Sequence, residues 1–265
     1  AVLFPLAALL MSSLLAQTAV ERAYFARPPG LPVPAPGSVS LGQYHLLLAM
    51  RPHYLEAFWT SGLLAAASVS GQMTVAVISG YALARLRFRG RGVMTALYVA
   101  AMLVPFQVML LPQYIALRAL GLYDSLWALI LPQVFAPMPV FLMRQAIRQV
   151  PDEWVEALRL ETSRSMPLFT QVLLPGVKPA AITLLALAFA EVWNMVEQPL
   201  IFLADAGKYP LSLALHGMAG EDAYSVFAGS VLYAAPALML WRACAEDMLQ
   251  GVSAAVSYHQ DVNEL

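Results

Sequence analysis

The sequence predicts an all-α, polytopic membrane protein. Hydrophobic residues make up 60% of its 265 positions and charged residues only 12%, and the mean hydropathy is +0.67. Soluble domains carry about 25% charged residues. Apolar runs of about 20 residues, the length that a membrane helix needs, recur along the chain. Together these observations favour a bundle of membrane helices over one large soluble core.

We expect six spans within a single transmembrane domain that covers residues 1–265. Their approximate ranges are 2–19, 57–84, 93–112, 125–143, 177–196 and 226–248. The first apolar run lacks the basic start of a signal peptide and leads into further spans, so we interpret it as a retained helix. Because the sequence begins with Ala1, we expect its start to lie inside or just before that helix. The single cysteine, Cys244, excludes a disulfide framework within the chain.

Basic residues concentrate in two connections between the predicted spans. One connection follows the second span and the other separates the fourth from the fifth: Arg85, Arg87, Arg89 and Arg91, then Arg144, Arg148, Arg159, Arg164 and Lys178. The other connections carry fewer: Arg22, Arg27, Arg51, Arg118 and Lys208. Because Lys and Arg favour cytoplasmic loops, we expect both rich connections, and both chain termini, on the cytoplasmic side.

Small residues and prolines mark the interiors of several spans. The small residues of the second span are Gly62, Ala67, Gly71, Ala76, Gly80 and Ala84. Their spacing lets helix backbones approach closely in lipid, which favours packing, although lining a transport pathway is the alternative. The prolines of other spans are Pro105, Pro132, Pro137, Pro139 and Pro236. A carbonyl freed by proline needs another partner at membrane depth, so we expect these helices inside a bundle or facing water.

A charge-dense connection at 150–170 separates the fourth and fifth spans. Pro151 suits the first position of a helix, and Asp152 and Glu153 would then lie in its first turn, where the helix dipole favours acids. Pro167 prevents one continuous helix, so we expect two short helices with a turn near 161–163.

The first of these helices is predicted to be amphipathic. Trp154, Val155 and Leu158 are expected to form one apolar face, with Glu156 away from it. A helix of this kind either rests on lipid headgroups or docks against a protein. Acids mixed among its bases suit a protein partner better than an anionic membrane surface.

This segment resembles the EAA coupling loop of binding-protein-dependent ABC importer permeases of the maltose-type carbohydrate subfamily. Glu156 and Ala157 match the start of the motif, Leu158 replaces its second Ala, and Arg159 matches its Arg. Glu161 stands where Asp is usual and Thr162 where Gly is usual, while the downstream matches are Phe169, Leu174-Pro175 and Lys178-Pro179. The likeness continues through 81–88, 90–91, 105–108, 120–124 and 249–251.

The resemblance implies a type I ABC importer permease fold in a bacterial inner membrane. It implies a coupling helix that fits a cleft on an ATPase, with these coupling residues: Trp154, Val155, Glu156, Ala157, Leu158, Arg159, Glu161 and Thr162. The implied partners are a second, paralogous permease, two ATP-binding cassette ATPases, an extracytoplasmic solute-binding protein and a carbohydrate or polyol cargo. Because β-branched residues resist the positive φ that Gly adopts freely, the turn at Thr162 is expected to be built differently or to couple less tightly.

Polar residues within the predicted fifth span are candidates for a translocation pathway. Glu191, Asn194 and Glu197 lie three apart, which predicts one helical face, and Trp193 flanks them. The carboxylates and amide would accept sugar hydroxyls and the indole would stack on a sugar ring. The Trp-Asn pair matches the family's fifth helix, whereas Met195 stands where an acid is usual. The alternative is that Glu197 only marks the outer interface.

Several classes of function are disfavoured by missing motifs. Neither Lys178 nor Lys208 belongs to a phosphate-binding loop, so we expect no ATP hydrolysis by this chain, with ATP and Mg²⁺ held by partner subunits. The histidines lack metal-ligand spacing, and no nucleophile stands beside a base.

The sequence thus predicts a carbohydrate importer permease without enzymatic activity or a cofactor of its own. The alternatives are a six-helix secondary transporter or channel without an ATPase, and a degenerate permease that serves assembly and gating.

Overall fold

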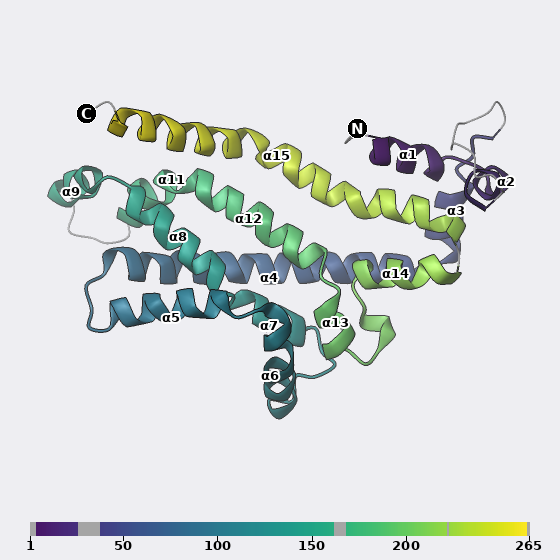
Figure 1. Ribbon diagram of the computed structural model, residues 1–265, viewed down its shortest axis with the longest axis horizontal. Coiled ribbons are helices and arrows are strands. Elements are labelled where there is room, and N and C mark those ends of the chain that lie inside the picture. The colour runs from purple at the N-terminus through teal and green to yellow at the C-terminus, as the bar shows by residue number, and fades with distance from the viewer. Residues whose placement is uncertain (1–3, 26–37, 162–167, 222, 264–265) are drawn as a thin grey trace. The chain divides into compact units, whose positions relative to one another are not determined.

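The computed structural model describes residues 4–25, 38–161, 168–221 and 223–263, which are predominantly helical. Figure 1 shows the helices, whose bounds are as follows: α1 (Phe4–Ser13), α2 (Gln17–Val20), the π-helix η1 (Glu21–Phe25), α3 (Gly42–Met50), α4 (Pro52–Arg85), α5 (Arg91–Leu103), α6 (Phe106–Ala119), α7 (Trp127–Val134), α8 (Pro137–Gln149), α9 (Asp152–Glu161), the π-helix η2 (Leu168–Leu173), α11 (Leu174–Gly176), α12 (Lys178–Trp193), α13 (Glu197–Phe202), the 3-10 helix η3 (Ala206–Lys208), α14 (Leu211–Glu221) and α15 (Ala223–Asn263). Within the described ranges, β pairing is limited to one isolated bridge between Leu15 and Val39.

The chain divides into two compact units. Unit 1 comprises Ala1–Leu64 and Trp193–Met239, and unit 2 comprises Ala65–Val192 and Leu240–Leu265. Helices α4, α12 and α15 contribute residues to both units. The single transmembrane domain over 1–265 stays a prediction.

Three helical stretches among the described residues are long and apolar enough to cross a membrane: Pro52–Arg85, Trp127–Gln149 and Tyr224–Glu246. They overlap the spans predicted at 57–84, 125–143 and 226–248. Two further pairs of helices reach the required length only as bent spans, Arg91–Leu103 with Phe106–Ala119 and Thr170–Gly176 with Lys178–Trp193. Counting each pair as one span brings the total to five, by length and composition.

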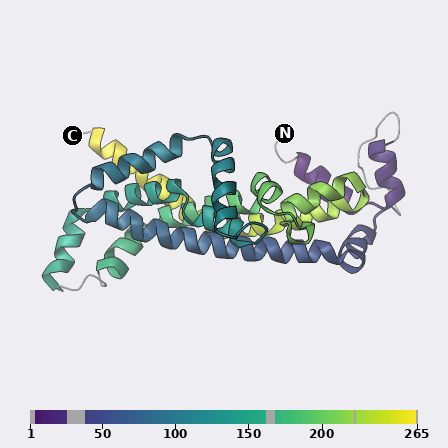
Figure 2. The same ribbon diagram turned by 90° about the horizontal axis from the view of Figure 1, so that it is seen from below.

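The predicted spans at 93–112 and 2–19 differ from the structure. The chain bends by 106° between α5 and α6, because Pro105 lacks an N–H and disfavours helical geometry at Val104. The corner between the two helices is visible in Figure 2. In the first span, α1 ends at Ser13, after 10 residues. A helix of that length rises only about 15 Å, half of a hydrocarbon core.

Small residues of α4 pack closely in unit 2, as the sequence predicted. A Cβ placed on Gly71 would lie 2.6 Å from Val134 Cγ2, and one on Gly80 would lie 3.0 Å from the backbone nitrogen of Arg144. Ala76 is fully buried between these positions. Gly62, in unit 1, has nothing within 4 Å of such a Cβ. The packing interpretation is therefore confirmed for Gly71 and Gly80.

Between α7 and α8, a backbone carbonyl that loses its helical donor to a proline is hydrogen-bonded by other groups. The carbonyl of Gln133 would receive a helical hydrogen bond from residue 137, but Pro137 has no N–H. The buried side chain of Gln72 donates to this carbonyl from Nε2 at 3.0 Å, and the Ala136 N–H reaches it at 3.2 Å. The expectation that such a carbonyl finds a partner within the bundle is confirmed at this position.

Buried polar side chains join distant segments of unit 1. The Tyr54 hydroxyl donates to the Gly229 carbonyl at 2.9 Å. Gln43, which is fully buried, donates to the Ser12 carbonyl at 2.7 Å and accepts from the Ala228 N–H at 3.3 Å. These bonds link α1, α3 and α4 to α15.

Candidate functional site

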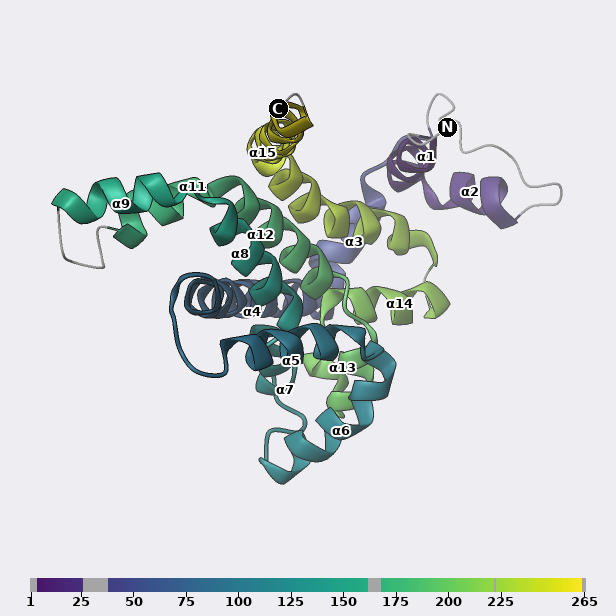
Figure 3. The same ribbon diagram turned by 60° about the vertical axis from the view of Figure 1, so that its left-hand side comes forward.

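The predicted coupling helix is present as α9. It begins at Asp152, so Pro151 lies just before the helix rather than at its first position. Asp152 and Glu153 occupy the first turn, where acids offset the partial positive charge of the helix N-terminus. The helix packs beside η2, the segment that precedes α11, as Figure 3 shows.

The apolar face predicted for α9 is divided in the structure. Val155 is 6% exposed and Leu158 packs against the same apolar cluster of unit 2, which includes Leu83 and Leu173. Trp154 is 55% exposed and therefore does not share that face. The reason is geometric, since successive residues of a helix are about 100° apart. Trp154 and Glu156 are thus both exposed on α9.

The rest of the predicted coupling set is described only in part. Ala157, Arg159 and Glu161 belong to α9, but their side chains lie outside the described part of the structure. Thr162 and the predicted turn near 161–163 fall at or beyond its boundary. Two short helices flank this gap, as predicted, although the second, η2, has π-helical geometry.

Arg85, the last residue of α4, joins α4 to the start of α9. Its guanidinium donates to the carbonyls of Ile147, at 3.0 Å, and Val150, and it forms an ion pair with Asp152. From the sequence, Arg85 was expected only in a cytoplasmic loop, and this contact with α9 was not predicted. Only the proximity of the two basic connections in the fold reveals it.

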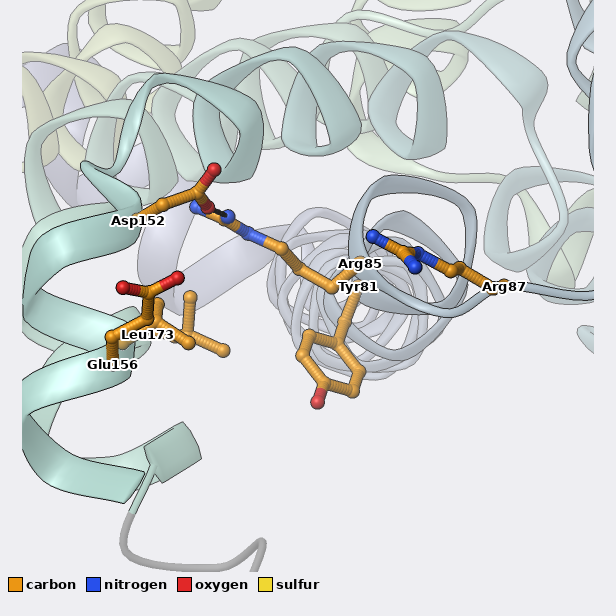
Figure 4. A pocket seen from close by; sticks show the side chains of 7 residues that line it. Tyr81, Arg85, Arg87, Asp152, Glu156 and Leu173 are labelled. Atoms are coloured by element: carbon orange, nitrogen blue, oxygen red, sulfur yellow. Dashed lines mark hydrogen bonds and ion pairs between the residues drawn. The ribbon is translucent and has the colours of Figure 1, made fainter. Parts of the chain in front are cut away.

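A pocket of about 420 Å³ opens beside this junction. Its lining residues are Tyr81, Arg85, Arg87, Asp152, Val155, Glu156 and Leu173. In Figure 4 the carboxylates of Asp152 and Glu156 lie on the α9 side and Arg87 on the opposite side. The pocket therefore presents both signs of charge at the surface of the predicted coupling helix.

The predicted pathway residues do not share one helical face. Helix α12 ends at Trp193, and Glu197 begins the separate helix α13, with Asn194 in the turn between them. Glu191 lies exposed in the last turns of α12, and Asn194 and Glu197 are exposed in unit 1. The turn interrupts the 3.6-residue period on which the prediction depended.

Trp193 belongs to the core of unit 1. It is 3% exposed, stacks on Tyr233 with ring centroids 5.7 Å apart, and meets Phe58 edge-on at 5.9 Å. Its indole N–H donates to the Tyr233 carbonyl at 3.0 Å. The predicted stacking of this indole on a sugar is therefore wrong for this conformation, because protein rings occupy its surroundings.

Tyr233 is a residue of this region that the sequence pattern did not predict. Its hydroxyl donates at 2.7 Å to Oδ1 of Asn194 and lies 3.1 Å from the Trp193 carbonyl. A polar tip on an aromatic residue within an apolar run was the available signal. The sequence does not say which segment that tip would reach.

Comparison with known proteins identifies the family. Residues 72–244 match the family model described as "Binding-protein-dependent transport system inner membrane component". The arabinooligosaccharide transport system permease protein AraQ of Bacillus subtilis (strain 168) is 27% identical over 90% of this chain and 84% of its own length. Protein LplC of the same strain is 26% identical over 68% of this chain and 60% of its own length. The sn-glycerol-3-phosphate permease protein UgpE of Yersinia pestis bv. Antiqua (strain Antiqua) is 31% identical over 55% of this chain and 52% of its own length.

Solved structures share the fold. A bacterial ABC transporter involved in the import of the acidic polysaccharide alginate superposes with a TM-score of 0.77 at 21% identity, over 92% of this chain and 90% of that chain. A bacterial alginate ABC transporter in complex with alginate pentasaccharide-bound periplasmic protein gives 0.61 at 13% identity, over 91% and 86%. With a family model that matches most of its length, this chain belongs to the inner membrane components of binding-protein-dependent transport systems.

Proposed function

We propose that this chain is a membrane-spanning subunit of an ATP-driven importer of carbohydrates. The observation that carries the proposal is the construction of α9. One side of the helix is anchored by Val155 in the core of unit 2, while Trp154 and Glu156 are exposed. A helix held by its own domain, with an aromatic and an acidic side chain facing outward, suits docking to an ATPase.

The cargo that we propose is a mono- or oligosaccharide or a related polyol. AraQ, named for arabinooligosaccharides, matches 90% of this chain, whereas UgpE, named for sn-glycerol-3-phosphate, matches 55%. The exposed carboxylates of Glu191 and Glu197 support a neutral cargo, because an anion would be repelled by them. Asn194 would then offer a hydrogen-bonding group in the same pathway.

The proposed assembly contains a second permease subunit, a paralogue, with two ATPases inside and a solute-binding protein outside. ATP and Mg²⁺ would be bound by the ATPases. The ion pair between Arg85 and Asp152 brings together the two basic connections, which supports a shared cytoplasmic location. The C-terminus, which two apolar helical segments separate from the connection at 150–170, would then also be cytoplasmic. A cytoplasmic N-terminus remains a prediction, since it requires residues 2–19 to cross the membrane.

Co-purification tests the ATPase partnership. The tagged chain is solubilised from its native membrane in mild detergent, and bound proteins are identified by mass spectrometry. We expect an ATPase and a second permease in near-stoichiometric amounts. Glu156→Lys should reduce recovery of the ATPase, because the exposed charge is reversed, while the chain still inserts into the membrane. Glu56→Lys, the same charge reversal at the exposed start of α4, serves as the control.

Uptake by proteoliposomes that contain the purified complex, its binding protein and ATP tests the cargo class. Radiolabelled arabinotriose, maltotriose and sn-glycerol-3-phosphate are suitable probes. ATP-dependent uptake of either saccharide would support the proposal, and uptake of the glycerol phosphate alone would contradict it. Uptake that persists without any ATPase would instead favour a secondary transporter or channel.

A further inference from the structure

Arg85 satisfies backbone groups that the sequence of the α8–α9 corner leaves without helical partners. The carbonyl of Ile147 would receive a hydrogen bond from residue 151, but Pro151 has no N–H. The last carbonyls of a helix also lack partners within it. Arg85 donates to the Ile147 carbonyl at 3.0 Å and to the carbonyl of Val150, so one side chain fills both positions.

The same guanidinium also pairs with the first residue of α9. Its ion pair with Asp152 is formed by Nη1, whereas both carbonyl bonds come from Nη2. The side chain of Arg85 is 17% exposed, so water competes weakly for its two bonds to carbonyls, whereas Asp152 is 79% exposed and its ion pair is open to solvent. Because the planar guanidinium holds its donors in a fixed fork, it restrains the end of α8 and the start of α9 at once.

Apolar packing makes this corner compact. Val150 and Val155 are each 6% exposed, and a Cβ on Gly176 would come within 3.1 Å of Val150 Cγ2. Apolar contacts alone allow neighbouring helices to slide in small steps. The three bonds of Arg85 specify one arrangement of α4 relative to the corner.

We propose that Arg85 is the positioning residue that makes α4 follow the movement of the coupling helix α9. The proposal rests on the proposed function, since it requires an ATPase that moves α9. A displacement of α9 would then be transmitted to the end of α4 through Asp152 and the two carbonyls. Helix α4 is continuous over 34 residues, which suits it to carry such a displacement into the membrane.

The test measures the distance between α4 and α9 in the purified full complex by pulsed electron paramagnetic resonance. Cys244, the single native cysteine, is replaced by Ser, and spin labels are attached at Thr74→Cys and Glu153→Cys, which are exposed sites in unit 2. Thr74 lies eleven residues before Arg85, about 16 Å along the helix, which leaves measurable separation. Spectra are recorded in nanodiscs without nucleotide and after trapping with ATP and vanadate.

We expect one narrow distance distribution that is the same in both nucleotide states. In Arg85→Ala the distribution should broaden and should shift on trapping with ATP and vanadate, while the ATPase still co-purifies. Arg85→Lys keeps the positive charge but loses the planar guanidinium with its several donors. Its distance distribution should be intermediate in width between those of Arg85→Ala and of the labelled chain that keeps Arg85. Arg89→Ala, which removes an exposed arginine from the same loop, should behave as the unmodified chain does.

Two results would overturn the proposal. One is a narrow distance distribution in Arg85→Ala that is the same in both nucleotide states. The other is a distance that changes with nucleotide in the labelled chain that keeps Arg85. Failure of the proposed function looks different, since no ATPase would then co-purify with any variant. The distance distributions of the labelled chain alone, recorded without nucleotide, would still show whether Arg85 restrains α9, because the distribution should be broader in Arg85→Ala. A merely structural role would lower the yield of Arg85→Ala without making the distance respond to nucleotide.

Discussion

Two polar segments follow long helices of this chain, and they are held by different chemistry. At the start of α9, in unit 2, the guanidinium of Arg85 bonds to two backbone carbonyls and to Asp152. At the turn after α12, in unit 1, aromatic rings surround Trp193, and a tyrosine hydroxyl reaches Asn194. The first arrangement holds backbone at a corner, and the second places one exposed amide beside a rigid apolar core.

This difference assigns different tasks to the two segments. Directed bonds to backbone carbonyls specify one geometry, which suits the transmission of a movement. The aromatic packing around Trp193 buries a large apolar side chain, so removing that ring leaves a large cavity. Substitutions in unit 1 should therefore affect stability most, whereas Arg85 should affect coupling.

The largest loss of stability is expected from Trp193→Ala. It removes a side chain that is 3% exposed and deletes contacts with Phe58 and Tyr233, so the free energy of unfolding should fall by about 3–5 kcal/mol. Thermal unfolding in detergent, followed by fluorescence, measures the change. Trp59→Ala, at a ring that is 72% exposed, is the control and should change little. Equal losses for both variants would contradict the assignment of Trp193 to the core.

Close helix packing in unit 2 should produce the next largest effect. Gly80→Ala would place a methyl group 3.0 Å from the Arg144 backbone nitrogen and 3.1 Å from Met143 Cβ. Such overpacking costs about 1–3 kcal/mol of unfolding free energy. Gly62→Ala is the matched control, with nothing within 4 Å of the added carbon, and should be neutral or stabilising. The ratio of folded to aggregated protein after heating, measured by size-exclusion chromatography, compares the two.

A smaller loss is expected from Gln72→Met, which removes the side-chain donor to the Gln133 carbonyl. Hydrogen bonds between membrane helices contribute about 0.6 kcal/mol on average and up to about 1.7. Pro137→Ala restores an N–H to the same carbonyl, so a double-mutant cycle in denaturant should show that Gln72→Met costs less in that background. Strict additivity would show that the proline-freed carbonyl does not depend on Gln72.

The smallest effect is expected from Tyr233→Phe. It keeps the ring that stacks on Trp193 and removes only the hydroxyl that donates to Asn194, so the loss should be about 0.6 kcal/mol or less. Thermal unfolding of Tyr233→Phe and of Trp193→Ala under the same conditions compares the two losses of stability. A loss as large as that of Trp193→Ala would show that hydrogen bonding, and not aromatic packing, holds this turn.

The turn after α12 shows where prediction from the pattern stopped. The apolar run and the polar residues Glu191, Asn194 and Glu197 were recognised from the sequence. The prediction assumed one continuous helix through all three, whereas α12 ends at Trp193 and α13 begins at Glu197. Trp193 was taken as a ligand surface, although it is a core residue. The missing information was the position of Tyr233, which lies 40 residues after Trp193 in the sequence and packs against it.

The sequence by itself determined the membrane character, the helical class and the location of the amphipathic helix α9. These properties depend on local quantities, namely the length of apolar runs, the placement of prolines and the spacing of Glu156 within its motif. The family match over residues 72–244 agrees with them. The close packing at Gly80 followed from the same local pattern, since small residues four apart line one side of a helix.

Only the tertiary structure decided which side chains hold these elements together. Arg85 and Ile147 are 62 residues apart in the sequence, a separation that no local motif spans. Their hydrogen bond exists because α4 and α8 lie side by side. The direction of Trp154 and the burial of Trp193 were settled in the same way. Hydrophobic patterning requires only that a face be covered, and it leaves open which distant residue covers it.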